Sequence, residues 1–353
     1  MASLQNKTDI ASMMPEEIAE LVRALGEPAY RGGQIFSHLT EGRGFDEMTN
    51  ISKAFRARLA EECEIRFPRT LKKLTSKIDG TVKFLFEMID GECIESVFMR
   101  YEHGNTLCIS TQAGCRMGCR FCASTLRGLS RNLTPSEMLG QIIMAQKETG
   151  ERISNIVMMG IGEPLDNFDN VVRFLRLVNH DKGLNIGYRH ISLSTCGLVD
   201  RIRELASLEL PITLSISLHS PDDETRSALM PINNKWNIHS LLSACADYYR
   251  TTGRRISFEY TLIRDKNDSP SDAAALADCL EREFRKKCGA PIHVNLIRVN
   301  ESGREGIERG TTDSAVRFAA ELSKRHVNAT VRRRMGADVN AACGQLRSSV
   351  ATE

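Results

Sequence analysis

Three closely spaced cysteines are the residues of this chain whose types and spacing point most directly to chemistry. Cys115, Cys119 and Cys122 form a C-x3-C-x2-C run. Three thiolates at this spacing can bind three irons of a [4Fe–4S] cube and leave the fourth iron open to an outside ligand. A structural zinc site normally has four protein ligands, and a fourth is not evident here. The run favours an iron–sulfur site, and zinc remains the alternative.

Further residues suited to binding a small molecule follow the segments that we expect to be strands. Gly162 and Glu163 lie in Gly160-Ile-Gly-Glu-Pro. A glycine lets a ligand approach backbone amides, and a carboxylate can accept a hydrogen bond from an ammonium group. A position at the end of a strand or just after it is expected for Ser194, Ser217, Leu218, His219 and Asn300. Ordinary turn geometry, or a histidine satisfied in the core, is the alternative for each.

Two more cysteines stand in contexts that suggest a reactive thiol. Cys343 lies in Asn340-Ala-Ala-Cys-Gly-Gln, where small neighbours would let a substrate approach the sulfur. Cys108 lies in a predicted strand, seven residues before Cys115. Without further information each could be a small buried hydrophobic residue, which is the common role of a cysteine in a reducing environment.

Alternating strands and helices must position these residues. Apolar segments predict strands over 106–110, 153–159, 190–195, 212–218, 256–263 and 293–299. Amphipathic segments between them predict helices, and Thr134-Pro-Ser-Glu is a capping box that begins one of them. The pattern predicts an α/β fold with a parallel sheet, as an incomplete barrel or a doubly wound sheet. Binding residues then belong after the carboxyl ends of the strands, as found above.

The chain divides into four expected parts. Residues 1–76 read as a small helical domain, and residues 77–103 as a β-hairpin around the turn at Asp90-Gly91. Residues 104–347 hold the alternating strands and helices, with the Cys343 loop at their end, and residues 348–353 form a tail.

Composition narrows the class of protein. Apolar residues make up 41% and charged residues 26% of the 353, and the net charge is only +2. Three stretches, 65–78, 103–136 and 322–337, hold basic residues and no acid, which fits a polyanion bound over a limited footprint. The sequence contains neither an apolar run of eighteen residues nor a signal peptide, so we expect no membrane span. Eleven cysteines without an export signal favour a reducing, cytoplasmic location.

The cysteine run after the first strand of a β/α domain resembles the radical S-adenosylmethionine (SAM) superfamily. Within it the chain resembles the RlmN family of dual-specificity RNA methyltransferases, from about residue 15 to residue 347. The segments that carry the resemblance are Tyr30-Arg-Gly-Gly-Gln-Ile-Phe, Cys119-Arg-Phe-Cys-Ala-Ser-Thr, Gly162-Glu-Pro-Leu, Ser217-Leu-His-Ser and Ala341-Ala-Cys-Gly-Gln-Leu.

The resemblance implies a partial (β/α)6 barrel that carries a [4Fe–4S] cluster and uses two SAM molecules per turnover. It implies methylation of C2 of an adenine in 23S rRNA and of the adenine next to the anticodon in certain tRNAs. An external electron donor such as flavodoxin and a monomeric state are implied as well.

The resemblance also assigns roles to residues. Cys115, Cys119 and Cys122 correspond to the cluster ligands. The SAM-binding positions correspond to Gly162, Glu163, Ser194, Ser217, Leu218, His219 and Asn300. Cys343 corresponds to the cysteine that is itself methylated, Cys108 to the one that later forms a disulfide with it, and Glu95 to a proton acceptor.

Two other functions remain open on the sequence alone. A relative that methylates C8 of adenine and confers antibiotic resistance shares the cluster, the paired cysteines and the substrate base. A non-catalytic RNA-binding protein with a structural zinc loop would need no Cys343 and would show no cluster absorbance near about 400 nm.

Overall fold

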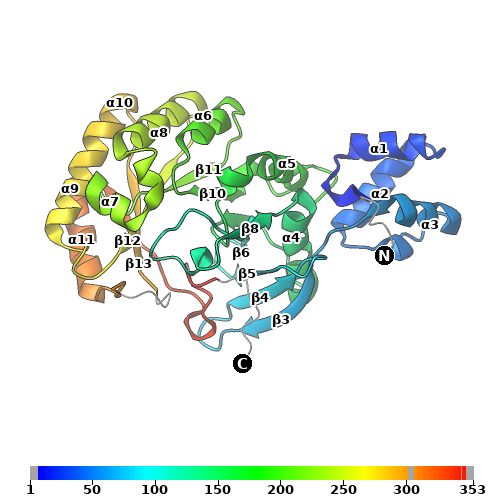
Figure 1. The fold of residues 1–353 in the computed structure, drawn as a ribbon, viewed down its shortest axis with the longest axis horizontal. Helices are drawn as coiled ribbons and strands as arrows, with labels where there is room; N and C mark the ends of the chain where they lie inside the picture. Colours follow the sequence, from blue (N-terminus) through cyan, green and yellow to red (C-terminus); the bar gives the residue numbers. More distant parts are fainter. Residues whose placement is uncertain (1–6, 301–305, 343, 347–353) are drawn as a thin grey trace.

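The computed structural model describes residues 7–300, 306–342 and 344–346. Most of them form one large α/β domain around a single sheet, and a smaller helical domain lies at one end of it (Figure 1). In the part of the chain that the structure describes, no helix is both long and apolar enough to cross a membrane.

The large domain is built on a ten-stranded sheet with the order β14-β13-β12-β11-β10-β9-β6-β5-β4-β3. In this sheet β6 and β9 to β14 pair in parallel, whereas β3, β4 and β5 form an antiparallel meander beside β6. Their bounds are β3 Arg69–Thr75, β4 Val82–Glu87, β5 Cys93–Met99, β6 Thr106–Cys108, β9 Asn155–Met158, β10 Ile191–Thr195, β11 Thr213–Ser217, β12 Ile256–Leu262, β13 His293–Arg298 and β14 Asn328–Val331.

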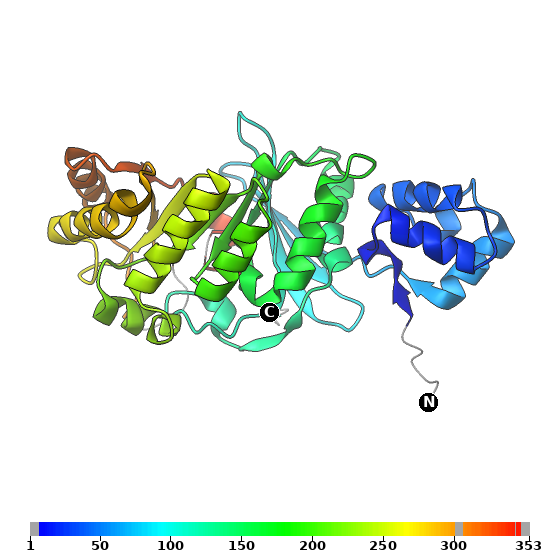
Figure 2. The same cartoon turned by 90° about the horizontal axis from the view of Figure 1, so that it is seen from above.

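Helices connect the parallel strands and cover one face of the curved sheet (Figure 2). They are α4 Pro135–Thr149, α5 Phe168–Asn179, α6 Val199–Ser207, α7 Asp223–Leu229, α8 Ile238–Thr252, α9 Pro270–Leu280, α10 Lys286–Cys288 and α11 Thr312–Lys324. The capping box that the sequence predicts is present at α4. Thr134 Oγ1 accepts from the backbone N–H of Glu137, and Glu137 Oε2 accepts from that of Thr134.

The predicted fold class, an incomplete parallel barrel with a helical N-terminal domain, is confirmed. All six predicted strands are present as β6 and β9 to β13. A further parallel strand, β14, was not predicted because three of its four residues are exposed and the fourth is only half-buried. It therefore lacks the apolar pattern on which the other predictions rested.

The N-terminal helical domain has a hydrophobic core of its own. Its elements are β1 Thr8–Asp9, α1 Pro15–Ala24, α2 Tyr30–Thr40, α3 Lys53–Glu62 and β2 Cys63–Glu64. The core gathers apolar side chains from all three helices, among them Ile18, Ile35 and Leu59. Arg173 of α5 binds Glu17 of α1 through two hydrogen bonds of 2.8 and 3.0 Å, which ties this domain to the large one.

The expected boundary of the helical domain at residue 76 is wrong. Residues 69–75 form β3, which pairs with β4 over its whole length and so belongs to the large sheet. The lysines and arginine of this segment conceal its strand pattern, because β3 lies at the edge of the sheet and most of its side chains are exposed.

Candidate active site

The loop that carries the cysteine run is closed at its base by a short antiparallel ribbon. Its strands are β7 Gln112–Gly114 and β8 Leu129–Asn132. The backbone N–H of Cys115 donates to the carbonyl of Gly128 at 2.9 Å. Inside the loop, Thr125 Oγ1 donates to the carbonyls of Cys119 and Cys122 at 3.3 and 3.0 Å. These bonds hold the three cysteines in one compact turn.

The three cysteines and most of the predicted SAM-binding residues line one cavity. It encloses about 920 Å³, its open mouth included. The predicted residues on its wall are Cys115, Cys119, Cys122, Gly162, Glu163, Ser194, Ser217, His219 and Asn300. They come from five loops or strand ends, which the parallel sheet brings to the same edge. Leu218 is the exception, since its side chain is fully buried in the core.

Glu163 is buried at the junction of β9 and β10 and holds two backbone segments. Its Oε2 accepts from the N–H of Cys196 at 2.7 Å, and its Oε1 accepts from the N–H of Leu165 at 3.1 Å. Burial raises the pKa of the carboxyl, and these hydrogen bonds oppose that rise. Each carboxylate oxygen can accept a further hydrogen bond, so Glu163 can also bind a ligand in the cavity that it lines.

His219 is held as a neutral imidazole of one tautomer. Burial lowers its pKa to about 3, with a smaller contribution from the Arg226 charge. The backbone N–H of Thr261 donates to Nδ1 at 2.9 Å, so the ring proton is on Nε2. The ring also packs edge-on against Phe121 of the cysteine loop, with 4.7 Å between centroids. His219 is therefore a fixed N–H donor beside the cluster loop.

The donor set fits a [4Fe–4S] cluster with a bound cofactor beside it. Three thiols lie on the wall of a cavity whose other walls carry hydroxyl, imidazole, amide and carboxylate groups. Burial raises the pKa of the Cys115 thiol to about 12, so a positively charged iron core would be needed to keep it as thiolate. Among the described residues no three His, Cys, Asp or Glu gather around a single metal ion. A [4Fe–4S] cube does not require its ligands to converge on one metal ion, since the three thiolates bind three different irons.

A second cavity of about 610 Å³, its mouth included, adjoins the first. The two share Met159, Ile297, Asn300 and Arg332. Cys108 of β6 lines the second cavity. Cys343 lies outside the described residues; its neighbour Ala342 lines the second cavity, and its neighbour Gly344 lines the first.

Glu95 lies on β5, close to the second cavity but not on its wall. Val97 and Met99, which share its face of the strand, do line that cavity, and Val97 pairs with Cys108. Glu95 is buried and binds Lys83 at 2.8 Å, and Lys83 donates to the carbonyl of Asn340 at 3.4 Å. Lys83 thus links Glu95 to the loop that precedes Cys343.

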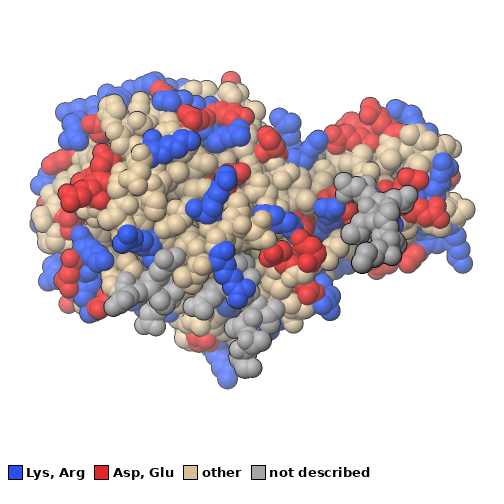
Figure 3. Space-filling model, viewed as in Figure 1, with Lys and Arg blue, Asp and Glu red and all other residues tan. Residues whose placement is uncertain are grey.

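Acid-free stretches of sequence do not all remain acid-free in space. Lys73 binds Glu148, Arg131 binds both Asp90 and Glu137, and Arg116 binds Asp166. Basic and acidic side chains are accordingly interspersed over the face drawn in Figure 3. Acids from distant segments therefore offset part of the positive charge of the first two stretches.

The third stretch does contribute to a basic surface. Arg332, Arg333 and Arg334 line the second cavity together with Arg298 and Arg309.

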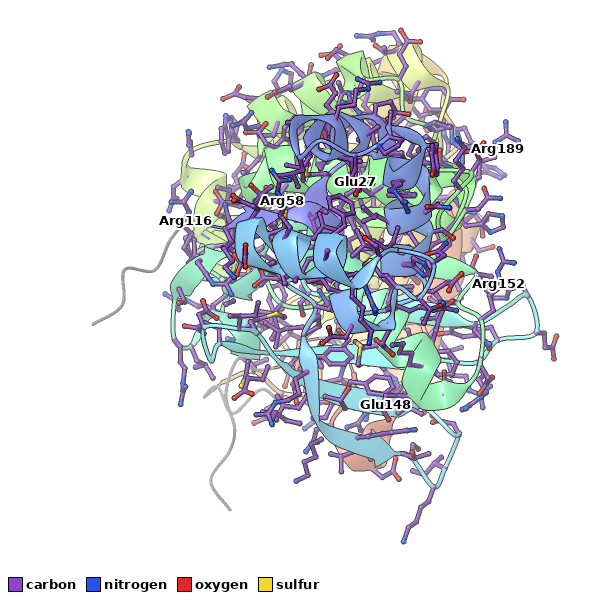
Figure 4. The ribbon with its side chains drawn as sticks, turned by 90° about the vertical axis from the view of Figure 1, so that its right-hand side faces the viewer. Glu27, Arg58, Arg116, Glu148, Arg152 and Arg189 are labelled. Carbon is purple, nitrogen blue, oxygen red and sulfur yellow. The ribbon has the colours of Figure 1, made fainter. Side chains whose placement is uncertain are left out.

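Other arginines mark the two edges of the sheet. Arg116 is on the cysteine loop, and Figure 4 shows it across the molecule from Arg152 and Arg189. These two directly precede β9 and β10, so they mark the amino edge of the sheet, whereas the cavities lie toward its carboxyl edge.

Several residues on the first cavity's wall were not predicted as site residues. Glu259 is buried at the middle of β12, accepts from Asn295 at 2.8 Å, and has a pKa raised by burial. Cys196 directly follows β10 and also lines this cavity. An acid inside the apolar segment Phe258-Glu-Tyr-Thr-Leu was a signal that could have identified Glu259.

Replacing Gly162 with alanine is expected to lower both the stability of the protein and its affinity for SAM. Gly162 has φ +107°, and an added Cβ would come within 2.6 Å of Gln112 Cβ and 2.8 Å of its backbone nitrogen. The positive φ alone costs an alanine about 1–3 kcal/mol, and the overlap with Gln112 adds to this cost. Gly91→Ala is the matched control, with φ +87° and open space around its Cβ. Urea unfolding and SAM titration should separate the two variants, and equal losses in both would contradict the close packing at Gly162.

Sequence profiles of two families match consecutive parts of the chain. Residues 8–65 match the ribosomal RNA large subunit methyltransferase N-terminal domain. Residues 109–277 match the radical SAM superfamily. The first match ends before β3, in agreement with the corrected boundary of the helical domain.

Curated relatives resemble the chain over almost its whole length. A protein of Lachnoclostridium phytofermentans is 48% identical over 99% of this chain and 97% of its own, and one of Alkaliphilus oremlandii is 51% identical over 97% and 98%. Each is named a probable dual-specificity RNA methyltransferase RlmN. The crystal structure of a radical SAM methyltransferase from Sphaerobacter thermophilus superposes with a TM-score of 0.91, at 39% identity, over 97% of this chain and all of the other.

Proposed function

This chain belongs to the RlmN family of radical SAM RNA methyltransferases, and we propose that it methylates C2 of a specific adenine in 23S rRNA. We propose the adenine next to the anticodon of certain tRNAs as a second substrate. The observation that carries this proposal is the pair of adjoining cavities. One is lined by the three cysteines and the other by Cys108 and five arginines, and they meet at Asn300 and Arg332.

The reactivity of the target carbon explains why a radical is needed. The C2 atom of adenine is electrophilic and has no lone pair, so a direct polar transfer of a methyl group cannot reach it. A carbon-centred radical can add to it. When bound, the [4Fe–4S] cluster and SAM supply a 5′-deoxyadenosyl radical able to remove hydrogen from a methyl group.

This chain's own residues then have distinct tasks in two cofactor-dependent steps. In the first cavity, Ser194, Ser217, His219 and Asn300 orient SAM by hydrogen bonds. Cys343 accepts a methyl group on its sulfur by polar transfer from a first SAM. A second SAM, when bound, would supply the radical that takes one hydrogen from this methyl group, and the methylene carbon left on the Cys343 sulfur would then add to C2 of the base.

Release of the product requires a base and a second thiol. We assign the removal of the C2 proton to Glu95; its ion pair with Lys83, which donates to the Asn340 carbonyl in the loop before Cys343, supports this role. The adduct radical also has to give up one electron to a one-electron acceptor, a role that the oxidised cluster would fill. The Cys108 thiolate then attacks the Cys343 sulfur, the bond from that sulfur to carbon breaks as the disulfide forms, and the released methylene carbon takes up a proton to complete the methyl group of the freed adenine. An external thiol or other reductant resets the pair.

The arginines at the second cavity are proposed to bind the RNA backbone. Replacing Arg333 with alanine is expected to weaken RNA binding and reduce the slope of log K against log salt by about 0.7–0.9, because one phosphate contact is lost. Arg201→Ala is the control, since Arg201 lies on α6 and binds Glu204. Filter binding at several salt concentrations checks this; an unchanged slope would remove Arg333 from the RNA footprint.

Further properties follow from the same proposal. The cluster needs electrons from outside, and a small donor such as flavodoxin is the class of partner we propose. Eleven cysteines and an RNA substrate support a reducing, cytoplasmic location. We propose that the protein acts as a monomer, because its two cavities and the residues assigned to them come from one chain.

The test is product analysis after anaerobic incubation of the reconstituted protein with rRNA or tRNA transcripts, SAM and a reductant. We expect 2-methyladenosine in the digested RNA. Formation of 8-methyladenosine would assign the protein to the C8-methylating relatives. A colourless protein that binds zinc tightly and forms neither product would exclude the proposed function.

A further inference from the structure

Arg226 is a fully buried arginine without an acidic partner. It lies on α7 and none of its surface is exposed. Its Nη1 donates to Asn233 Oδ1 at 2.8 Å, and its Nε donates to the carbonyl of Leu218 at 3.1 Å. Its Nη2 donates to the carbonyls of Cys196 and Ser217 at 2.8 and 3.1 Å. Within the described residues no carboxylate forms an ion pair with it.

This arrangement is costly as it stands. Hydrogen bonds to carbonyls satisfy the N–H groups of a guanidinium but do not cancel its charge. Buried charges in proteins are ordinarily paired or bound to an ion of opposite sign. A protein that keeps an arginine in such a place is therefore expected to bring a negative charge close to it.

The place of Arg226 indicates where that charge would be. The carbonyls of Cys196 and Ser217 lie at the ends of β10 and β11, on the wall of the first cavity. The backbone N–H of Arg120, next to Cys119 in the cysteine loop, donates to the carbonyl of Leu229 at the end of α7. Burial lowers the pKa of the guanidinium; the Asp223 charge opposes this, and thiolates at Cys196 or Cys119 on the cavity wall would oppose it as well, although burial keeps both of these thiols protonated unless a metal core binds them.

We propose that Arg226 is the fixed counter-charge of the iron–sulfur cluster, and that it raises the potential at which the cluster accepts an electron. This proposal rests on the proposed function, since it requires that the three cysteines hold a cluster. A [4Fe–4S] core with three thiolates is negative overall and becomes more negative on reduction. A cation fixed in a low-dielectric surrounding stabilises the reduced form more than the oxidised form.

The same residue positions the cofactor site. Because Arg226 bonds the carbonyls of Cys196, Ser217 and Leu218, it fixes the ends of two adjacent strands that carry Ser194, Ser217 and His219. Substitution would thus act through geometry as well as charge, and the test must separate the two effects.

The first measurement is the midpoint potential of the reconstituted cluster, followed by visible absorbance and electron paramagnetic resonance during a redox titration. Arg226→Gln should lower the ratio of reduced to oxidised cluster at a fixed potential about tenfold, which corresponds to 59 mV for a one-electron couple. Arg226→Lys keeps the charge but loses most of the hydrogen bonds, so its potential should stay near that of the wild type. Arg173→Gln, which removes an exposed pair with Glu17, is the control and should not change the potential.

The second measurement compares thermal stability with and without the cluster. A counter-charge predicts that cluster loading raises the melting temperature of the wild type more than that of Arg226→Gln. A role confined to hydrogen bonding predicts equal losses in the loaded and cluster-free proteins, and would overturn the proposal.

The outcomes also distinguish this proposal from the proposed function. A wild-type protein that cannot be loaded with iron and sulfide contradicts the proposed function. A loaded wild type with the same potential as Arg226→Gln contradicts only the role of Arg226. If Arg226→Gln fails to fold, the test rests on Arg226→Lys. A midpoint potential of that variant 59 mV or more below that of the wild type, which is a tenfold change in the ratio of reduced to oxidised cluster, would contradict the charge argument.

Discussion

Replacing Cys343 with alanine is expected to reduce RNA methylation to background while iron content and cluster absorbance stay unchanged. A methyl group must be held on a protein sulfur before a radical can carry it to the unreactive C2 carbon. Alanine has no atom that can take up this group. The three cysteines proposed to bind the cluster are on a different loop, so the cluster should be unaffected. Methylation assays and iron analysis of the same preparation check both parts.

Cys288→Ala is the matched control for that experiment. Cys288 is half-buried on α10, and it lines neither of the two cavities. Its loss should leave methylation at the wild-type level. Methylated RNA from Cys343→Ala in more than trace amounts would mean that the methyl group reaches the base by another route.

Replacing Cys108 with alanine is expected to stall the reaction with the protein covalently attached to RNA. The carbon–carbon bond to adenine would form, but no second thiol would attack the Cys343 sulfur to release the product. Cys108 lines the second cavity, as do Ala341 and Ala342, and it pairs in the sheet with Val97, two positions after Glu95. A denaturing gel should show a band of protein with bound RNA, which disappears after nuclease treatment.

A second cysteine of the meander provides the control for Cys108. Cys93 begins β5, pairs with Glu87 in the sheet and lines neither cavity. Cys93→Ala should turn over without a shifted band. Free 2-methyladenosine produced by Cys108→Ala at the wild-type rate would remove the resolving role from Cys108.

The features that could be predicted from the sequence are those determined by neighbouring residues. The spacing of Cys115, Cys119 and Cys122, the capping box at Thr134 and the apolar strands are local patterns. Because parallel strands share a carboxyl edge, residues placed after these strands could also be expected to meet. Gly162, Ser194, Ser217 and His219 do line one cavity.

The features that could not be predicted depend on contacts between distant segments. β14 has no apolar pattern, because its side chains are largely exposed at the sheet edge. Lys73 meets Glu148 and Arg131 meets Asp90 only after folding. The net charge of a stretch of sequence therefore did not predict the charge of the surface that this stretch forms. In the sequence Arg226 looks like an ordinary helical arginine, since the residues beside it in the chain do not show that it is buried without an ion pair to a carboxylate.

The most direct test of the route through Cys343 is anaerobic turnover with SAM whose methyl group carries three deuteriums. Nucleosides from the digested RNA and 5′-deoxyadenosine are then analysed by mass spectrometry. We expect 2-methyladenosine that retains two of the deuteriums, with the third in 5′-deoxyadenosine, because the radical removes one from the methyl group on sulfur. A product that retains all three would mean direct methyl transfer and would contradict the role of Cys343.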